Sequence, residues 1–493
     1  MTRSVFCAVA LAANMAVMSV EMLSTRLLFP RYGNTVFTWS AVISIVIAGL
    51  FLGYMAGGWL TDRKTSLPRL VFLELLAAGI LVSAVPLLCD LLFPPSSTAS
   101  TPPLAACFIV FGLPAAALAA TGPAVVGILA RGGWSASFAS GVVSSLAAAG
   151  SIGGTLLTTF ALIPAFGVRG LFEAMGAALG LAALAVFLAQ RQAVRAGLAA
   201  AGIGALAAVL GFTAASPPQD MAAAPVFSRD SRYQLVRVFE SGLGRSSVRV
   251  LMLDSTQEGA MRLSDKAVVF EYTTSYRLLV NALKRHEAPR VLFIGGGAYA
   301  MPVRVAEELP RSVVEVAEID PVVEEAGKMF FRIGETPNLR TLLADGRQAL
   351  RQAGGRYDGV FVDAYQGVMA IPFHLTTREF FEEVRSALRP GGVVGLNVIG
   401  RVDERDGLFC AMAQTLAEVF PTVRVHPIHG PKDELQNIIM AASADPAADL
   451  SGVLAGTAFS RGLDMASLRC APGQVLTDDH APAEWLAAKY LAR

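Results

Sequence analysis

The sequence predicts two kinds of fold in one chain: an N-terminal all-α transmembrane bundle, and then an α/β domain preceded by a small β-domain. Of the 493 residues, 54% are hydrophobic, compared with roughly 45–50% in soluble domains, and the apolar mass lies in the first 215. Beyond them, strand-like and helix-like runs alternate, which is typical of a parallel sheet. The expected parts are residues 1–215 for the bundle, 216–228 for a linker, 229–285 for the β-domain and 286–493 for the α/β domain.

Seven segments of the first part are long and apolar enough to cross the hydrocarbon core of a bilayer, which is about 30 Å thick. Small residues crowd several of them, as in 53–57 and 150–154, and permit close approach of helices. We therefore expect a multi-pass protein of a bacterial-type plasma membrane, with the lipid bilayer as its partner. The seven segments are residues 4–25, 37–60, 68–92, 104–129, 135–165, 168–190 and 196–215.

The β-domain is expected to contain short paired strands. Residues 233–239 and 246–253 read as two strands on either side of a glycine-containing turn at 242–244. Together with residues 267–270, they are predicted to cover the active edge of the larger sheet.

The α/β domain is organised around residues 290–299. An apolar strand leads directly into Gly295, Gly296 and Gly297, and a helix is expected to begin near residue 301. Because glycine has no Cβ, the backbone here can turn sharply and approach a ligand closely. The N-terminus of the following helix would add unpaired N–H donors. This pattern predicts a nucleotide site.

Carboxylates follow the next strands along the chain. Glu318 and Asp320 end a strand about 20 residues after the glycines, where doubly wound folds place an acid that holds the ribose hydroxyls. Asp345 and Asp363 end the third and fourth strands, and a fifth strand is expected at 392–399. Because the carboxyl ends of parallel strands meet at one edge of a sheet, we expect one shared site. The alternative is that these acids only cap helices.

These residues carry a family resemblance. The ordered segments 291–297, 318–320, 344–346, 362–363 and 375–381 resemble the spermidine synthase (polyamine aminopropyltransferase) group within the Rossmann-like class I methyltransferase fold. Residues 231–234 and 253–254 resemble the small N-terminal β-domain of that family. Residues 57–63 and 161–167 are similar to membrane-anchored members, whose helices resemble half of a major-facilitator bundle.

The resemblance implies a cosubstrate, S-adenosylmethionine or its decarboxylated form, and roles for single residues. The glycines would contact the nucleoside, Glu318 the ribose and Asp345 the adenine, while Asp363 would orient or deprotonate the acceptor. The cosubstrate-binding candidates are Gly295, Gly296, Gly297, Glu318, Asp320, Asp345, Gly346 and Gln257. The catalytic candidates are Asp363, Tyr365 and Gln366, and the acceptor-site candidates are Tyr276, His374, Asp479 and His480.

Three departures from the family pattern bear on the acceptor. Ala298 and Tyr299 replace an Asp-Gly pair, residues 363–366 replace an acidic pair, and residues 274–276 stand where the family has Tyr-(His/Gln)-Glu. A diamine needs carboxylates at both ends, so ordinary putrescine aminopropylation is not expected. The acceptor is a small molecule, with an amine among the options. Three functions stay open: aminopropyl or methyl transfer, a transporter-like bundle with a nucleoside-sensing domain, and a non-catalytic scaffold.

Charge and cysteine usage exclude other classes. Residues 216–493 carry 30 basic and 34 acidic side chains, which offers no basic footprint for nucleic acid. No Cys-x-x-Cys occurs, the histidines lack metal-ligand spacing, and Cys410 and Cys470 are expected to be isolated, so no metal is predicted. A homodimer is left open.

Two inferences from the sequence disagree about the side of the membrane on which the C-terminal domain lies. Lys and Arg concentrate at the N-terminus and in alternate loops, at 63–69, 131 and 191–195. The positive-inside rule then puts the N-terminus in the cytoplasm, and seven spans leave the C-terminal domain outside. The sulfonium nucleosides implied by the resemblance are cytosolic, which favours the other side. We lean to the cytoplasmic side because of the cosubstrate.

Overall fold

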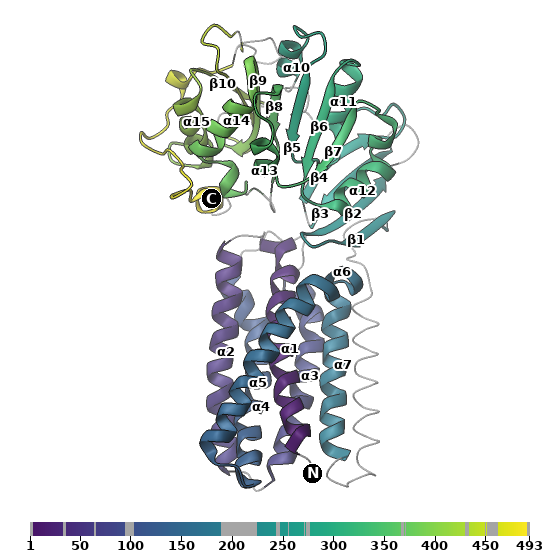
Figure 1. Ribbon diagram of the computed structural model, residues 1–493, viewed down its shortest axis with the longest axis vertical. Helices are drawn as coiled ribbons and strands as arrows, with labels where there is room; N and C mark the ends of the chain where they lie inside the picture. Colours follow the sequence, from purple (N-terminus) through teal and green to yellow (C-terminus); the bar gives the residue numbers. More distant parts are fainter. Residues whose placement is uncertain are drawn as a thin grey trace. The chain divides into compact units, whose positions relative to one another are not determined.

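The computed structural model forms two compact units, drawn in Figure 1. The first comprises Met1–Ala224 with Asp230–Gln234, and the second comprises Pro225–Arg229 with Leu235–Arg493. The second unit thus begins inside the predicted linker and contains the β-domain together with the α/β domain. The structure describes residues 3–32, 36–63, 66–93, 103–188, 224–242, 247–254, 256–270, 272, 277–365, 369, 371–428, 433–448, 450 and 462–490.

The first unit is a bundle of long apolar helices. Six of the described helices are long and apolar enough to cross a membrane, and they coincide with the first six predicted spans. The seventh predicted span, residues 196–215, lies outside the described residues. The elements are α1 (Arg3–Tyr32), α2 (Val36–Arg63), α3 (Leu67–Leu92), α4 (Pro103–Arg131), α5 (Ala136–Leu157), the π-helical turn η1 (Thr158–Leu162), α6 (Ile163–Phe166) and α7 (Val168–Leu188).

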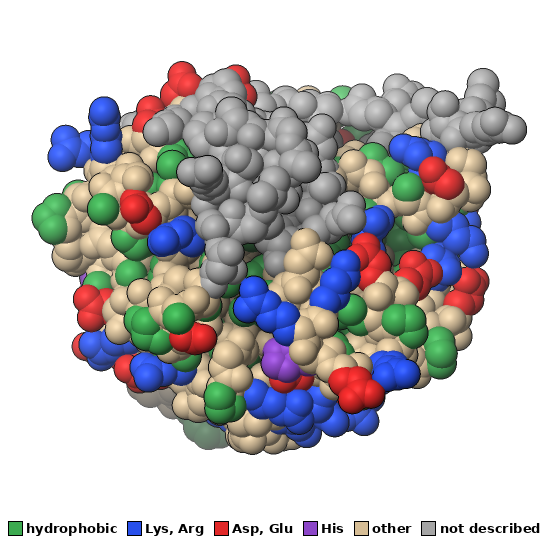
Figure 2. Space-filling view, turned by 90° about the horizontal axis from the view of Figure 1, so that it is seen from above, with side chains coloured by type: hydrophobic (Ala, Val, Ile, Leu, Met, Phe, Trp, Pro, Cys, Tyr) green, Lys and Arg blue, Asp and Glu red, His purple; other side chains and the backbone are tan. Residues whose placement is uncertain are grey.

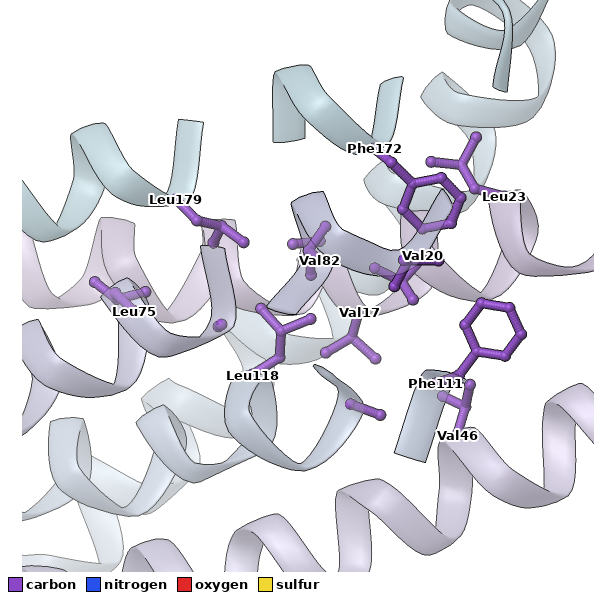
Figure 3. Packing of buried hydrophobic residues seen from close by; sticks show 14 of the residues in the cluster. Val17, Val20, Leu23, Val46, Leu75, Val82, Phe111, Leu118, Phe172 and Leu179 are labelled. Atoms are coloured by element: carbon purple, nitrogen blue, oxygen red, sulfur yellow. The ribbon is translucent and has the colours of Figure 1, made fainter. Parts of the chain in front are cut away.

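Small residues allow the helices of the bundle to touch backbone to backbone, as predicted. A Cβ atom placed on Gly53 of α2 would lie 2.3 Å from the carbonyl oxygen of Ala116 on α4, and one on Gly154 of α5 would lie 2.4 Å from that of Met15 on α1. Larger side chains fill the remaining interior, where residues of α1, α2, α3, α4 and α7 form one buried cluster (Figure 3). An ion pair joins α3 to α7, because Arg169 binds both carboxylate oxygens of Asp90 at 2.5 and 2.8 Å.

The outward-facing side chains of the bundle are also apolar, as a lipid environment requires. Ile47 and Phe51 of α2 and Phe108 and Leu113 of α4 are all exposed. In water, so large an apolar surface would favour aggregation, whereas in a bilayer it faces hydrocarbon.

A small antiparallel sheet opens the second unit. β2 pairs antiparallel with β3, which confirms the predicted pairing, and β3 also pairs antiparallel with β4, a strand that was not predicted. A register shift between Leu251 and Met252 interrupts the ladder of β3 with β4. The strands, in the order β1-β2-β3-β4, are β1 (Phe227–Asp230), β2 (Leu235–Ser241), β3 (Val248–Leu253) and β4 (Thr256–Arg262).

The larger sheet has seven strands in the order β10-β11-β9-β8-β5-β6-β7. The five predicted strands pair in parallel around β5. Beyond β9, β11 runs antiparallel to it, and β10 pairs antiparallel with β11 and so points in the same direction as β9. The strands are β5 (Arg290–Ile294), β6 (Val313–Glu318), β7 (Leu339–Leu343), β8 (Tyr357–Val362), β9 (Leu388–Gly400), β10 (Thr422–Pro427) and β11 (Gln436–Ser443).

Helices cover both faces of this sheet and bury one apolar cluster on each face. Along β5 the side chains alternate, with Val291 and Phe293 in one cluster and Leu292 and Ile294 in the other. The first cluster includes residues of α10 (Arg277–Leu283), α11 (Ala300–Glu308) and α12 (Pro321–Phe330). The second includes residues of α13 (Gly346–Arg351), α14 (Arg378–Ala387), α15 (Leu408–Val419) and α16 (Ala483–Ala488). Basic and acidic side chains are interspersed over the described part of the face in Figure 2.

The expectation that Cys410 and Cys470 are isolated is wrong. The two residues form a disulfide with a Cα–Cα distance of 5.3 Å across a sequence separation of 60 residues. The C-terminal segment packs against α15, where Ala471 accepts a hydrogen bond from Gln414 at 2.7 Å. This long-range packing brings the two sulfur atoms together, and no local spacing of the cysteines in the sequence predicts the disulfide.

Candidate functional site

Gly295 is required where β5 leaves the sheet. Its φ is +96°, and a Cβ atom at this position would lie 2.3 Å from the carbonyl oxygen of Asp363. Two backbone hydrogen bonds of 2.9 Å fix the end of β5 to its neighbours: the N–H of Gly295 donates to the carbonyl oxygen of Ala317, and the N–H of Asp363 donates to that of Ile294. The ends of β5, β6 and β8 therefore meet at Gly295, Gly296 and Gly297, called the glycine loop below, as the sequence predicted.

The buried ring of Tyr299 packs against the glycine loop. It adopts a left-handed conformation with φ +53° just before α11 and is fully buried. Its hydroxyl lies 3.2 Å from Oγ1 of Thr341 on β7. A Cβ atom on Gly296 or on Gly327 would approach the ring to 2.9 or 2.8 Å. One departure from the family pattern is therefore a packing residue of the core.

Glu318, the predicted ribose ligand, holds the loop through backbone amides. One carboxylate oxygen accepts from the N–H of Gly296 at 2.8 Å, and the other accepts from that of Asp320 at 2.8 Å. Burial raises the pKa of Glu318 to about 7, although these amides act in the opposite direction. A carboxylate offers about four acceptor positions, so capacity for a ribose hydroxyl remains. Asp320 itself caps α12 by accepting from Val322 at 2.9 Å.

Asp345, the predicted adenine ligand, caps α13. One oxygen accepts from the N–H groups of Arg347 and Gln348 at 3.0 and 3.1 Å, and the other lies 3.0 Å from Nε2 of His374. His374 therefore contacts a cosubstrate candidate, although it was predicted at the acceptor. Gly346 lets α13 pack tightly on β5, since a Cβ there would lie 2.2 Å from a side-chain carbon of Ile294.

Asp363 is held in one orientation by donors from two sides. Nδ2 of Asn397 on β9 donates to Oδ1 of Asp363 at 3.0 Å, and Nδ2 of Asn437 on β11 donates to the oxygen of Asn397 at 3.0 Å. The hydroxyl of Tyr272 also donates to Asp363. Burial raises the pKa of Asp363 to about 6, while both hydrogen bonds lower it. The carboxylate is thus oriented and titrates within the range useful for proton transfer.

A pocket of about 530 Å³, part of it open to solvent, lies between β4, the glycine loop and Asp363. Two carboxyl groups reach it, those of Glu258 and Asp363. Burial, together with the nearby charges of Asp363 and Glu318, raises the pKa of Glu258 to about 8. The lining residues are Glu258, Gly259, Val268, Phe270, Tyr272, Phe293, Gly295, Gly296, Gly297, Ala298, Ala300, Met301, Pro302 and Asp363.

The structure distributes the remaining predicted residues outside this lining. Gln257 is exposed on β4, one residue from Glu258, and Asp479 and His480 lie exposed in a turn closed by a bridge between Thr477 and His480. The hydroxyl of Tyr365 donates to the backbone oxygen of Asn397 at 3.0 Å and accepts from the N–H of Ile399 at 2.9 Å. Gln366 and Tyr276 lie outside the described residues.

Three site residues were missed by reasoning from sequence: Glu258, Tyr272 and Asn397. The alternation of side chains along a strand places Glu258 and Gln257 on opposite faces, so sequence could have offered either one. Tyr272 lies only two residues from position 274, where the family pattern places its tyrosine. Nothing in the sequence points to Asn397, because its role depends on the pairing of β9 with β8.

Comparison with known proteins agrees with this geometry. Residues 277–444 match the family model described as "Spermine/spermidine synthase domain". The chain is 35% identical over 136 residues to a polyamine aminopropyltransferase of Vibrio vulnificus, covering 27% of this chain and 44% of that protein. It is 33% identical over 177 residues to spermidine synthase 1 of Datura stramonium, covering 34% and 53%. The chain thus spans about half the length of the curated relatives it matches.

Among solved structures, a probable spermidine synthase from Corynebacterium glutamicum aligns with a TM-score of 0.41 and 21% identity, covering 46% of this chain and 85% of that one. The α/β part of the protein has the class I methyltransferase fold that the sequence predicted. The C-terminal part of the chain contains a spermidine synthase domain, and six helices apolar enough to span a membrane precede it.

Proposed function

We propose that the protein is a membrane-anchored transferase that binds S-adenosylmethionine or decarboxylated S-adenosylmethionine and transfers an aminopropyl or methyl group to a small-molecule acceptor. The observation that carries this proposal is the placement of Asp363. Asp363 directly follows β8 beside the glycine loop. Its carboxylate accepts hydrogen bonds from Asn397 and Tyr272, and the residue lines the pocket. The match of residues 277–444 to a synthase domain supports the same reaction class.

The residues at the sheet edge have the chemistry that a sulfonium nucleoside requires. The glycine loop provides an approach free of side chains, and Glu318 retains acceptor positions for ribose hydroxyls. Asp345 provides a carboxylate near the third strand for the base, with His374 beside it. These residues would position the carbon next to sulfur, and positioning supplies much of the acceleration in such displacements.

Asp363 would supply the acid–base step. An amine acceptor attacks only after it loses a proton, and a carboxylate with a pKa of about 6 can hold that proton near neutral pH. In the proposed reaction, the acceptor nitrogen forms a bond to carbon, the carbon–sulfur bond breaks with its electron pair on sulfur, and the acceptor proton passes to Asp363. The leaving group is then a neutral thioether.

The test uses the full chain in detergent micelles, where both faces of the protein are accessible. Calorimetry with each sulfonium nucleoside should detect binding, and product analysis with a panel of mono- and diamines should detect transfer. Asp363→Asn should keep nucleoside affinity within about twofold while transfer falls at least about 100-fold. Absence of binding to either nucleoside overturns the proposal. Equal transfer by wild type and variant removes Asp363 from the mechanism.

One observation favours a second function, transport by the bundle. Glu74 lies about two turns inside α3 and is buried, and neither carboxylate oxygen has a hydrogen-bond partner among the described residues. Acids inside membrane helices commonly mark ion or proton paths. Proton flux in proteoliposomes, measured with a pH-sensitive dye, tests this: flux lost in Glu74→Gln supports transport, and equal flux in both proteins removes Glu74 from it.

A further inference from the structure

Glu258 reaches the pocket because β4 lies directly against the glycine loop. A Cβ atom on Gly259 would lie 2.3 Å from Cβ of Ala298, so only glycine allows this approach. A Cβ atom on Gly297 would lie 3.3 Å from the carbonyl oxygen of Glu258 and 4.0 Å from its Cβ. The Glu258 side chain therefore starts next to Gly297, in the loop that the proposed function assigns to the nucleoside.

The two carboxyl groups of the pocket differ in their partners. Asp363 accepts hydrogen bonds from Asn397 and Tyr272. Glu258, by contrast, makes no side-chain hydrogen bond or ion pair with any residue that the structure describes, although Asp363 and Glu318 lie near enough to repel its charge. A carboxylate without partners is costly to bury, and a cationic group entering the pocket would relieve that cost.

No side chain among the described lining residues of the pocket carries a positive charge. The other side chains of the lining are apolar, aromatic or absent, and none of the described lining residues is Lys, Arg or His. A ligand carboxylate placed here would face Glu258 and Asp363 without a counter-charge. An ammonium group would meet two carboxylates and the aromatic rings of Phe270 and Tyr272, which also favour cations.

We propose that Glu258 is a specificity residue that selects the tail of the cosubstrate by charge: it favours a tail that ends in an ammonium group alone and rejects one that also carries a carboxylate. The inference rests on the proposed function and resolves which of the two sulfonium nucleosides the site takes, namely the decarboxylated form. Ala298, next to the glycine loop, has no charge with which to distinguish the two nucleosides. The inference therefore assigns that selectivity to Glu258 on β4.

The experiment compares three probes on the full chain in detergent: decarboxylated S-adenosylmethionine, S-adenosylmethionine, and methylthioadenosine, which has the same nucleoside but no charged tail. Titration calorimetry at about pH 9, where Glu258 is charged, should show that the wild type prefers the decarboxylated nucleoside at least about 30-fold, since juxtaposed like charges strongly disfavour binding. In Glu258→Gln, this preference should shrink about tenfold while methylthioadenosine affinity is unchanged. Glu258→Asp should retain most of the preference.

Glu287→Gln is the matched control, because the Glu287 side chain is 84% exposed and Glu287 is not among the residues that line the pocket. It should keep the wild-type preference. If Glu258→Gln binds methylthioadenosine normally and keeps the full preference, the inference is overturned while the proposed function stands. If none of the three probes binds the wild type, the proposed function itself fails.

Discussion

The side-chain amide of Asn397 donates a hydrogen bond of 3.0 Å to Oδ1 of Asp363. Its own Oδ1 accepts a hydrogen bond of 3.0 Å from Nδ2 of Asn437. Three adjacent strands, β8, β9 and β11, thus supply one chain of polar groups. Because the second donor orients the first, the Asp363 carboxylate has one preferred rotamer. A catalytic base needs such support, since a small misplacement of the reacting group lowers the rate sharply.

The Asn397→Ala variant should therefore slow transfer without weakening cosubstrate binding. Loss of a hydrogen bond to a charged group predicts roughly a tenfold lower kcat. This hydrogen bond lowers the pKa of Asp363, so its removal raises that pKa, and the acidic limb of the pH–rate profile should move to higher pH. A merely structural role would leave the limb in place. Asn281→Ala, at an exposed position on α10, is the control for nonspecific effects.

The turn at Gly295 should tolerate no side chain. Gly295→Ala combines an unfavourable positive φ with a Cβ atom 2.3 Å from the Asp363 carbonyl oxygen. It should destabilise the domain by well over about 1 kcal/mol and reduce nucleoside binding. Gly473→Ala is the matched control, because Gly473 has φ +84° but a Cβ atom added there would meet no other atom within 4 Å. Equal melting temperatures for the two variants would show that the destabilisation comes from backbone strain alone and not from the contact between residue 295 and the Asp363 backbone.

The preference for the decarboxylated nucleoside should rise with pH. The pKa of Glu258 is raised to about 8, so the group is largely neutral at lower pH and becomes charged as pH rises through about 8. An alkyl ammonium tail, with a pKa near 10, stays protonated over this range. The preference measured by calorimetry should increase from about pH 6.5 to about pH 9 and stay flat in Glu258→Gln. The other titratable groups around Glu258 are Asp363, Glu318, Asp254 and Tyr272.

The C-terminal segment should contribute pH-dependent stability through Asp478. Arg347 binds both oxygens of Asp478 at 2.7 Å, and these hydrogen bonds lower the pKa of Asp478 to about 2. A lowered pKa gives stability that is present above the unfolded pKa, near 3.9, and lost as pH falls through about 2. Because the Asp478 side chain is 45% exposed, Asp478→Asn should cost only about 1 kcal/mol at neutral pH.

That loss is measured by thermal unfolding, and the difference from wild type should shrink as pH falls from about 5 toward about 2. Asp479→Asn, in the same exposed turn, is the control. An undiminished difference in acid would mean that the ion pair with Arg347 is not its source.

The disulfide between Cys410 and Cys470 predicts the side of the membrane. Disulfides persist in oxidising compartments and are rare in the cytosol, so the soluble domain should lie outside, as seven spans and the positive-inside rule also imply. In intact membranes, a thiol-reactive polymer should label these two cysteines only after reduction. No labelling even after reduction would instead place the domain in the cytoplasm, which the polymer does not reach and where the cosubstrate argument puts it. A variant without Cys7, Cys89 and Cys107 isolates the signal.

Much of the architecture follows from local sequence. The first six spans were predictable because each is a continuous apolar run, and the five parallel strands because each apolar run ends in Gly, Glu or Asp. Eight of the candidate positions, from Gly295 to Asp363, lie at or just after the carboxyl ends of β5, β6, β7 and β8 for this reason. The acceptor candidates Asp479 and His480 do not line the pocket, since a polar cluster in the sequence says nothing about which element it packs against.

By itself, the sequence determined the membrane segments, the doubly wound fold and the carboxylates at the strand ends, because these depend on hydrophobic periodicity and on residues adjacent in the chain. Tertiary structure alone decided that Glu258 and not Gln257 faces the pocket, that Asn397 orients Asp363, and that Cys410 meets Cys470. Each of these depends on strand register or on long-range packing, and a shift of one residue along a strand reverses which side chain points inward.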